Sequence, residues 1–216
     1  MAVASAAMEA DTPPPRELLN HGEPTRPRPA STVLLVRDGT DGLEVLLVQR
    51  GPTARFMASV WVFPGGAVDA HEGHGEQGHR LAAVREVEEE TGVRLADPDA
   101  LVLLSRWVTP TLYRLRFDTW FFLAELPVGP EVSIDGHECV AFAWLTPARA
   151  LARFRAKEML MVLPTVSHLE QLDGMSTPAR ALATARNRGP SHVEPLVVGS
   201  GDSARVVLAR GNETSS

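Results

Sequence analysis

The sequence predicts an α/β fold in which helices sandwich a mixed β-sheet. Short β-branched runs bounded by Gly, Pro and Asp alternate with longer segments of helical character, an alternation typical of this class. The 216 residues, 44% of them hydrophobic, suffice for one domain with a sizeable core and do not require two. No apolar run approaches the roughly 20 residues that a membrane-spanning helix needs, so no membrane contact is expected.

Charge and cysteine content indicate which binding partners and which cellular compartment to expect. The formal net charge is −6 and the 21 Lys and Arg residues are scattered, whereas a nucleic-acid surface needs clustered basic side chains, so no nucleic-acid partner is expected. The single cysteine, Cys139, cannot form an internal disulfide, which favours a reducing setting. The start MAVASAAMEADTPPP does not resemble a secretory signal, and we predict a cytoplasmic location.

Three regions differ in character along the chain. Residues 1–28 are rich in Pro and charge and lack apolar periodicity, which predicts a disordered or loosely attached tail. Residues 29–165 carry most of the predicted strands and form the expected domain. Residues 166–216 are expected to be an extension packed on that domain, ending in the polar tail GNETSS.

The first half of the domain begins with a predicted hairpin. Two β-branched runs, 32–36 and 43–49, flank the turn sequence DGTDG. A short strand at 60–63 is ended by Pro-Gly-Gly, and the polar, glycine-rich loop HEGHGEQGH follows. The next segment, 77–91, is predicted to be a helix that stops at Gly92.

The second half alternates strands and helices. LVLLSRWVTP and FDTWFFLAEL are predicted strands joined by a turn at 109–114, and HECVAFAWL is another strand. In that strand, Cys139 and Ala141 are expected on one face and Val140 and Phe142 on the other. PARALARF starts a helix with proline in its first turn, SHLEQL and TPARALATARNR are further helices, and HVEPLVV and ARVVLA are short strands.

The sequence REVEEETG places four glutamates within one and a half helical turns. On a helix, Glu86, Glu89 and Glu90 share a face, Glu88 points away, and Arg85 can reach Glu89 one turn on. Three such carboxylates repel one another in the absence of a cation, and their hard oxygen atoms suit Mg²⁺ or Mn²⁺. Acidic helix faces are usually only solvated surface. The glycine pair of FPGG, about twenty residues upstream, favours an ion site because its backbone can approach a bound ion closely.

FPGG followed by AAVREVEEETGV resembles the Nudix box, the signature of a family of diphosphate-cleaving hydrolases. The second half of the box is matched completely from Arg85 to Val93, and the resemblance covers about residues 30–160. It implies a Nudix-like α/β/α sandwich with a mixed sheet.

The first half of the box departs from the family pattern. Gln77 stands where the family has its first glutamate, with Glu76 one residue earlier, so we expect Arg85 to lack its usual carboxylate support. The stretch HEGHGEQGH lengthens the interval after Gly66. This longer loop, together with LLVQRGPTARFM, is similar to the branch that includes the coenzyme A diphosphatases.

The resemblance implies metal-dependent hydrolysis of a nucleoside diphosphate linked to a second group. The expected Mg²⁺ or Mn²⁺ ligands are the Gly66 carbonyl and the carboxylates of Glu86, Glu89 and Glu90. Glu89 is expected to contact the water-bearing ion and to double as the base, and Arg85 to orient Glu89.

Two residues outside the box are candidates for a role in the site, and each also has a simpler interpretation as a surface residue. Glu138 is a candidate base because a glutamate outside the box sometimes does that work in the family; it is equally an exposed carboxylate at a strand edge. Arg50 is a candidate contact for a substrate phosphate, with ordinary surface charge as the alternative.

Two functions remain open at this point. The first is a hydrolase acting on coenzyme A, acyl-coenzyme A or another small nucleoside diphosphate derivative. The second is a non-catalytic Nudix-like module that binds a nucleotide as a sensor, although such modules typically lose one or more of the glutamates. A homodimer is a further expectation carried over from the resemblance.

Overall fold

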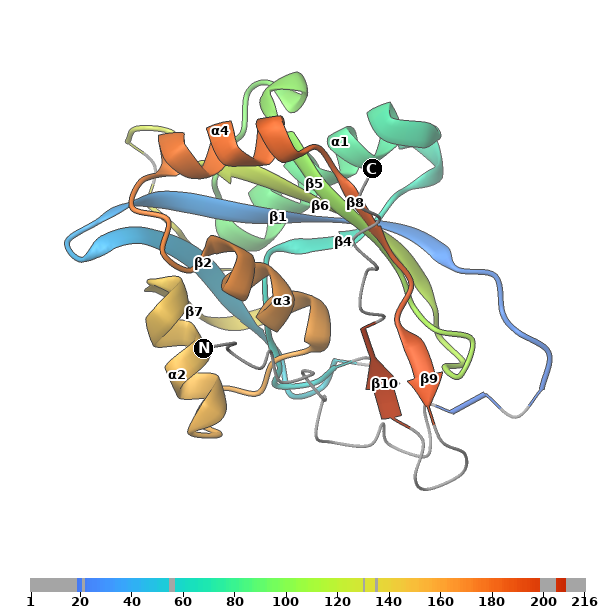
Figure 1. Cartoon of the computed structure of the whole chain (residues 1–216). Helices are drawn as coiled ribbons and strands as arrows, with labels where there is room; N and C mark the ends of the chain where they lie inside the picture. The colour runs from blue at the N-terminus through green and yellow to red at the C-terminus, as the bar shows by residue number, and fades with distance from the viewer. Residues whose placement is uncertain are drawn as a thin grey trace, which may run out of the picture.

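The computed structural model describes residues 19–20, 22–54, 57–129, 131–134, 136–198 and 205–208. In this part of the chain an eight-stranded sheet lies between helices (Figure 1). The strands of the sheet are β1 (Arg28–Gly39), β2 (Gly42–Arg50), β3 (Trp61–Val62), β4 (Gly65–Ala67), β5 (Val102–Val108), β6 (Phe117–Glu125), β7 (Cys139–Leu145) and β8 (Ser191–Val193). The helices are α1 (Gly75–Thr91), α2 (Pro147–Arg155), α3 (Leu163–Leu172) and α4 (Pro178–Arg188).

The sheet is mixed, as the sequence predicts. β1 and β2 form the expected antiparallel hairpin, whereas β1 pairs with β6 in parallel. Away from their turn β1 and β2 separate, and the glycine-containing segment fills the gap: β4 pairs with β1 and β3 pairs with β2. β7 pairs with β2. β5 pairs with β6, and β8 pairs in parallel with β5 on the side of β5 away from β6.

The two faces of the sheet are covered by different helices. Side chains alternate along β1, so that Val33 and Leu35 pack toward α1 while Leu34 and Val36 pack toward α2, α3 and α4. This arrangement confirms the predicted α/β/α sandwich. The cluster on the first side, called here the α1-face cluster, consists of Val33, Leu35, Leu46, Val48, Ala83, Val87, Val93, Leu101, Phe122, Ala124 and Cys139.

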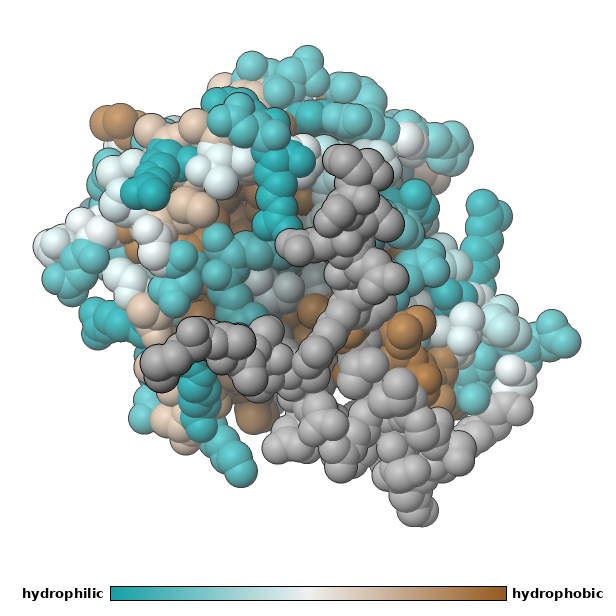
Figure 2. All heavy atoms as spheres, in the orientation of Figure 1, coloured by the Kyte–Doolittle hydropathy of each residue, from teal (hydrophilic) through white to brown (hydrophobic). Residues whose placement is uncertain are grey.

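Helices α3 and α4 and strand β8 are the parts of the region after residue 165 that pack on or pair with the eight-stranded sheet. α3 and α4 contribute Leu169, Leu172 and Ala181 to the core on their face. Beyond β8, β9 (Leu196–Val198) and β10 (Arg205–Val207) form a separate two-stranded sheet. Apolar side chains are visible at the position of β9 in Figure 2, where Leu196 is 53% exposed. The tail GNETSS lies outside the described residues.

Residues 1–18 of the expected N-terminal tail lie outside the described residues. Residues of the part that follows contact the turn between β5 and β6. Leu19 pairs with Tyr113 in the turn between β5 and β6. The Thr25 hydroxyl donates to the Arg114 carbonyl over 2.8 Å. This part of the chain is therefore attached to the domain just before β1 begins.

The prediction for the faces of β7 is wrong at its first residue. A register irregularity lies opposite Gln49 and Arg50, where Arg50 pairs with Cys139 and Gln49 with Ala141. The extra residue of this bulge changes the alternation, so Cys139 joins the α1-face cluster instead of facing the other side with Ala141. Cys139 is fully buried, as expected of a small apolar side chain.

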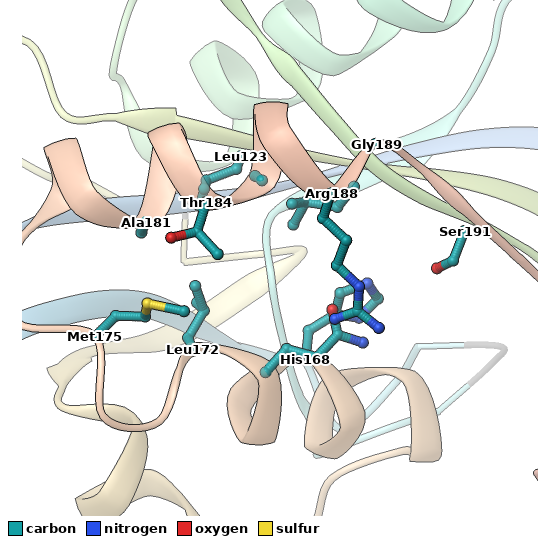
Figure 3. Close-up of a pocket in the computed structure, with 12 residues that line it drawn as sticks. Leu123, His168, Leu172, Met175, Ala181, Thr184, Arg188, Gly189 and Ser191 are labelled. Carbon is teal, nitrogen blue, oxygen red and sulfur yellow. The ribbon is translucent and has the colours of Figure 1, made fainter. Parts of the chain in front are cut away.

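A pocket lies between α3 and α4 (Figure 3), on the face of the sheet opposite α1. Its wall includes His168, which is fully buried. The Nε2 atom lies 2.7 Å from the Ser105 hydroxyl and Nδ1 lies 2.7 Å from the Pro164 carbonyl. Burial lowers the pKa of His168 to about 4. With both ring nitrogens bonded and the ring neutral, His168 is part of the core packing.

None of the described helices combines the length and apolar composition that a membrane crossing requires.

Candidate active site

Helix α1 presents the acidic face toward the glycine pair of β4. Ala83 and Val87 anchor the helix in the α1-face cluster, and the helix ends as predicted at Gly92, whose φ of 69° is left-handed. Glu88 is exposed on the other side of the helix. The 3.6-residue period therefore places Glu86 and Glu90 against β4.

The glycine pair allows these carboxylates to come close. The Gly65 N–H donates to Glu90 Oε2 over 3.0 Å. A Cβ atom at Gly66 would collide with the Glu86 carboxylate, and one at Gly65 would collide with the Ser31 carbonyl. Only glycine at these two positions leaves room for the observed packing. The structure thus brings Gly66, Glu86 and Glu90 together.

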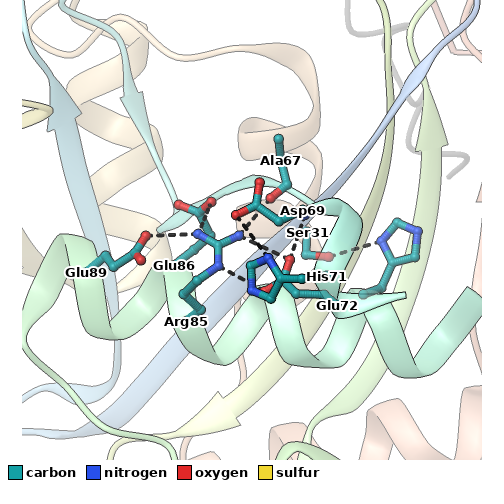
Figure 4. A network of polar contacts seen from close by, with 9 residues as sticks. Ser31, Ala67, Asp69, His71, Glu72, Arg85, Glu86 and Glu89 are labelled. Atoms are coloured by element: carbon teal, nitrogen blue, oxygen red, sulfur yellow. Dashed lines mark hydrogen bonds and ion pairs between the residues drawn. The ribbon is translucent and has the colours of Figure 1, made fainter. Parts of the chain in front are cut away.

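Arg85 connects the acidic residues (Figure 4). Its Nη1 atom donates to Glu86 Oε1 over 2.8 Å and to Glu89 Oε2 over 2.9 Å. Its Nε donates to Glu72 Oε1 over 2.9 Å, and Nη2 donates to the Ala67 carbonyl over 2.9 Å. These hydrogen bonds, foremost that to Glu72, raise the pKa of Arg85, which therefore stays charged. The predicted contact between Arg85 and Glu89 is confirmed.

The expectation that Arg85 lacks a supporting carboxylate is wrong, because Glu72 provides it. Five residues, 67–71, separate Gly66 from Glu72, and this spacing is the signal that sequence reasoning missed. The extra residues of this chain lie between Glu72 and Arg85, in the turn before α1 and in its first part. Gln77 and Glu76, the positions considered from the sequence, are exposed on the first turn of the helix.

Glu72 is fixed in a 3₁₀ turn at Ala70–Glu72. Its side chain is buried and its Oε2 accepts from the Asp69 N–H over 2.7 Å. Burial alone would raise the pKa of Glu72, but the hydrogen bonds from Arg85 and Asp69 outweigh it and lower the pKa. Glu72 is therefore the ionised partner of a charge-assisted, bidentate pair.

Glu90 lies in the interior, 4% exposed. Burial raises its pKa to about 7, and the nearby charge of Glu86 adds to this shift. The Gly65 N–H, Arg50 and the Cys139 thiol act in the opposite direction. At neutral pH the site thus contains an incompletely compensated carboxylate.

The ionised form of Glu86 is also disfavoured. Its pKa is raised by burial and by the negative charges of Glu89 and Glu138, although Arg85 opposes the shift. The effect of Glu138 shows that the structure brings this candidate base close to the acidic cluster. The backbone contributes to its placement, since the Gly51 N–H donates to the Glu138 carbonyl over 2.8 Å.

The oxygen atoms of Glu86, Glu89 and Glu90 suit a hard divalent cation, provided that the Glu89 side chain changes its orientation. Glu90 is buried and Glu86 is partly buried, and the negative charge of Glu86 disfavours the ionisation of Glu90, as expected of a site that a cation neutralises. Within the part of the chain that the structure describes, no three His, Cys, Asp or Glu side chains are already arranged as metal ligands. The Glu89 side chain is 59% exposed and is bonded to Arg85, so it must turn from Arg85 to join the other two.

Arg50 lies at the end of β2, beside this cluster. It pairs with Cys139 across the two strands and interacts with Glu90, so it faces the same side of the sheet as α1. Its Nε atom is buried and has no hydrogen-bond partner among the described residues. A buried donor without a partner is unfavourable, and this distinguishes Arg50 from an ordinary surface arginine.

His79 fixes α1 to the strand next to the glycine pair, a contact that the sequence did not predict. Its Nδ1 atom lies 3.0 Å from both the Ala30 carbonyl and the Ser31 hydroxyl, and its ring stacks on Trp120 at 4.6 Å. Burial lowers the pKa of His79. Because Ser31 is the register partner of Gly66, this contact sets the position of the helix against the site.

Comparison with known proteins identifies the family. A model of the NUDIX domain matches residues 26–164, which is more than half of the chain. The chain therefore belongs to the Nudix family.

Its relatives include nudix hydrolase 7 of Caenorhabditis elegans, 28% identical over 67% of this chain and 60% of that protein. The acyl-coenzyme A diphosphatase NUDT19 of Xenopus laevis is 22% identical over 63% of this chain and 61% of that protein. The chain thus spans about three fifths of the length of these two relatives. The crystal structure of a NUDIX hydrolase from Alicyclobacillus acidocaldarius superposes with a TM-score of 0.67 at 27% identity, covering 74% of this chain and 96% of that one.

Replacing the buried partner of Arg85 should destabilise the protein. Glu72→Gln leaves Arg85 without its ionised partner, and the free energy of unfolding should fall by about 2 kcal/mol. Glu76→Gln, which alters an exposed pair with Arg80, should cost less than about 0.5 kcal/mol. Urea denaturation measures both values. Equal losses in the two variants would contradict the assignment of Glu72.

Glu90 should make stability depend on pH. Its pKa rises from 4.5 in the unfolded chain to about 7 in the fold, so between these values the folded protein keeps a proton that the unfolded chain loses. Stability therefore falls as pH rises through this window, and the penalty is complete above pH 7. Glu90→Gln cannot ionise, and above pH 7 it should be more stable than the native protein by up to about 3 kcal/mol.

Urea denaturation at pH 5 and pH 8, with a chelator present, tests this difference. Glu88→Gln is the matched control because Glu88 is exposed and pairs with Arg94. It should follow the native protein at both pH values. An identical pH dependence in Glu90→Gln and the native protein would contradict the burial of a charged Glu90.

Proposed function

We propose that this chain is a metal-dependent hydrolase that cleaves the diphosphate linkage of a nucleoside diphosphate joined to a second group. The observation that carries the proposal is the packing of Glu86 and Glu90 against the Gly65–Gly66 pair, with Arg85 bonded to Glu86 and Glu89. Nudix proteins generally use divalent metal ions. A face that served only as solvated surface would not need two glycines under buried carboxylates.

The ligands for Mg²⁺ or Mn²⁺ would be the Gly66 carbonyl and the carboxylates of Glu86, Glu89 and Glu90. A bound divalent ion supplies neutralisation of the diphosphate oxygens and a water of lowered pKa. The raised pKa values of Glu86 and Glu90 support this assignment, because both groups gain from a nearby positive charge.

Proton transfer is assigned to Glu89. Its carboxylate is the most exposed of the three and can take a proton from the attacking water. The water oxygen then forms a bond to phosphorus while the bridging P–O bond of the diphosphate breaks, giving two phosphate products. Arg85 is a positioning residue that holds Glu89 between turnovers. Glu138 is the alternative base, and its proximity to Glu86 supports that alternative.

Arg50 is proposed to contact a substrate phosphate. Its buried, unpartnered Nε and its position beside Glu90 support this role, since a phosphate oxygen would satisfy the donor and balance the charge.

The substrate proposal follows the relative that is named an acyl-coenzyme A diphosphatase. Coenzyme A and acyl-coenzyme A are small nucleoside diphosphate derivatives, as the chemistry of the site requires. The cytoplasmic location and the homodimer stay predictions.

Removing the proposed base should abolish turnover without unfolding the protein. Glu89→Gln keeps the size and polarity of an exposed side chain but cannot accept the proton, so kcat should fall about 100-fold or more. The assay is product release from coenzyme A, acyl-coenzyme A, nucleotide sugars and dinucleotides with Mg²⁺ or Mn²⁺. Mass spectrometry in ¹⁸O-labelled water identifies the products and the attacked phosphorus.

Two variants complete this test. Glu88→Gln, on the far side of the same helix, should stay within about twofold of the native kcat. Glu138→Gln separates the two candidate bases, because Glu138 is not among the proposed metal ligands. Turnover should persist in Glu138→Gln if Glu89 is the base, and a loss of about 100-fold or more in Glu138→Gln would assign the base to Glu138. Full activity of Glu89→Gln would remove Glu89 from the mechanism. Inactivity of the native protein on every compound would favour the nucleotide-binding sensor.

A further inference from the structure

We propose that the nucleoside base of the substrate stacks on Phe142, on an exposed apolar patch of β7 formed by Val140 and Phe142 (the β7 patch). The proposal rests on the hydrolase function above and specifies how the substrate lies in that site. In this orientation the nucleoside of the bound substrate extends from the acidic cluster toward β7.

Phe142 faces the same side of the sheet as the acidic cluster. It is the register partner of Val48 on β2, and directly opposed residues of antiparallel strands project to the same face. Val48 belongs to the α1-face cluster. The next residue of β7 on that face, Trp144, packs against the same cluster.

The exposure of Phe142 is unusual for this position. Phe142 and Val140 are both 41% exposed, although Val48, the residue opposite Phe142, is completely buried. Large apolar side chains left open beside a polar site are typical of ligand contacts. Helix α1 packs on β1 and β4, and the patch lies across the sheet on the edge strand β7.

The register also gives the distance from the patch to the phosphate contact. Arg50 lies opposite Cys139 and Val48 lies opposite Phe142, so two residue steps separate the pairs along β2, about 7 Å, and the bulge places one extra residue between them on β7. Val140 lies between them, with its Cγ1 atom next to Gly51. This is about the separation that a ribose places between a base and its 5′-phosphate. A nucleotide whose phosphate meets Arg50 can therefore place its base over Phe142.

The geometry favours a planar base over an alkyl chain as the occupant. A phenylalanine ring on an open strand offers one flat contact surface, which suits the π-face of a base. An alkyl chain gains most from walls that surround it, and the pocket lined by α3 and α4 lies on the other face of the sheet.

The test compares the binding of two non-hydrolysable probes, AMP and ribose 5-phosphate, which differ only in the base. Isothermal titration calorimetry on the full chain should give tighter binding of AMP than of ribose 5-phosphate. In Phe142→Ala the affinity for AMP should fall about tenfold, toward that for ribose 5-phosphate, while the affinity for ribose 5-phosphate stays within about twofold. Phe142→Trp should restore AMP binding because it restores a ring.

Leu196→Ala is the matched control, since Leu196 is an exposed apolar side chain of the separate β9–β10 sheet. It should leave both affinities unchanged. Equal affinity of the native protein for AMP and ribose 5-phosphate would overturn the proposal, as would native AMP affinity in Phe142→Ala. Neither probe is a diphosphate, so these outcomes do not depend on turnover. A hydrolase with unchanged AMP binding in Phe142→Ala would refute only the stacking site.

Discussion

The structure of the site depends on one electrostatic constraint: several carboxylates on one helix face must lie against a backbone turn without driving each other apart. The Gly65–Gly66 pair removes the steric obstacle, because a Cβ atom at Gly65 would collide with the backbone of Ser31 and one at Gly66 would displace the Glu86 carboxylate. Arg85 supplies the positive charge, and Glu72 holds Arg85 in place from the 3₁₀ turn. Burial, with nearby negative charge added to it, raises the pKa values of Glu86 and Glu90, and a divalent cation is the natural way to compensate their charges.

The acidic cluster lies on one face of the sheet, and the larger of the two apolar core clusters lies on the other. Helices α2, α3 and α4 pack on one face of the sheet through a continuous apolar core, while α1 carries its carboxylates on the other face. The position of α1 is fixed both by Val87 in the core and by the contacts of His79 with β1. The helix can thus hold charged groups at low exposure without loss of its register against β4.

Local patterns predicted the parts of the site that lie within one element. The period of the helix gave the shared face of Glu86 and Glu90, and the stop at Gly92 followed from the need for a left-handed residue. Features that depend on pairing between elements were missed. Glu72 was not recognised as the partner of Arg85 because the sequence alignment with the family pattern placed the extra residues directly after Gly66. Cys139 lies on the other face than predicted because of the bulge in β7. His79 contacts β1 only in the tertiary fold, so its own sequence neighbourhood does not indicate the contact.

The central claim, that the carboxylates beside the glycine pair bind a divalent cation, is tested most directly by titrating the protein with Mn²⁺ and measuring free Mn²⁺ by electron paramagnetic resonance. The native chain and Glu88→Gln should bind Mn²⁺ alike. Glu86→Gln and Gly66→Ala, which remove a ligand or displace Glu86, should weaken binding by about tenfold or more. Absence of Mn²⁺ binding by the native chain, or equal binding by all four proteins, would contradict the account.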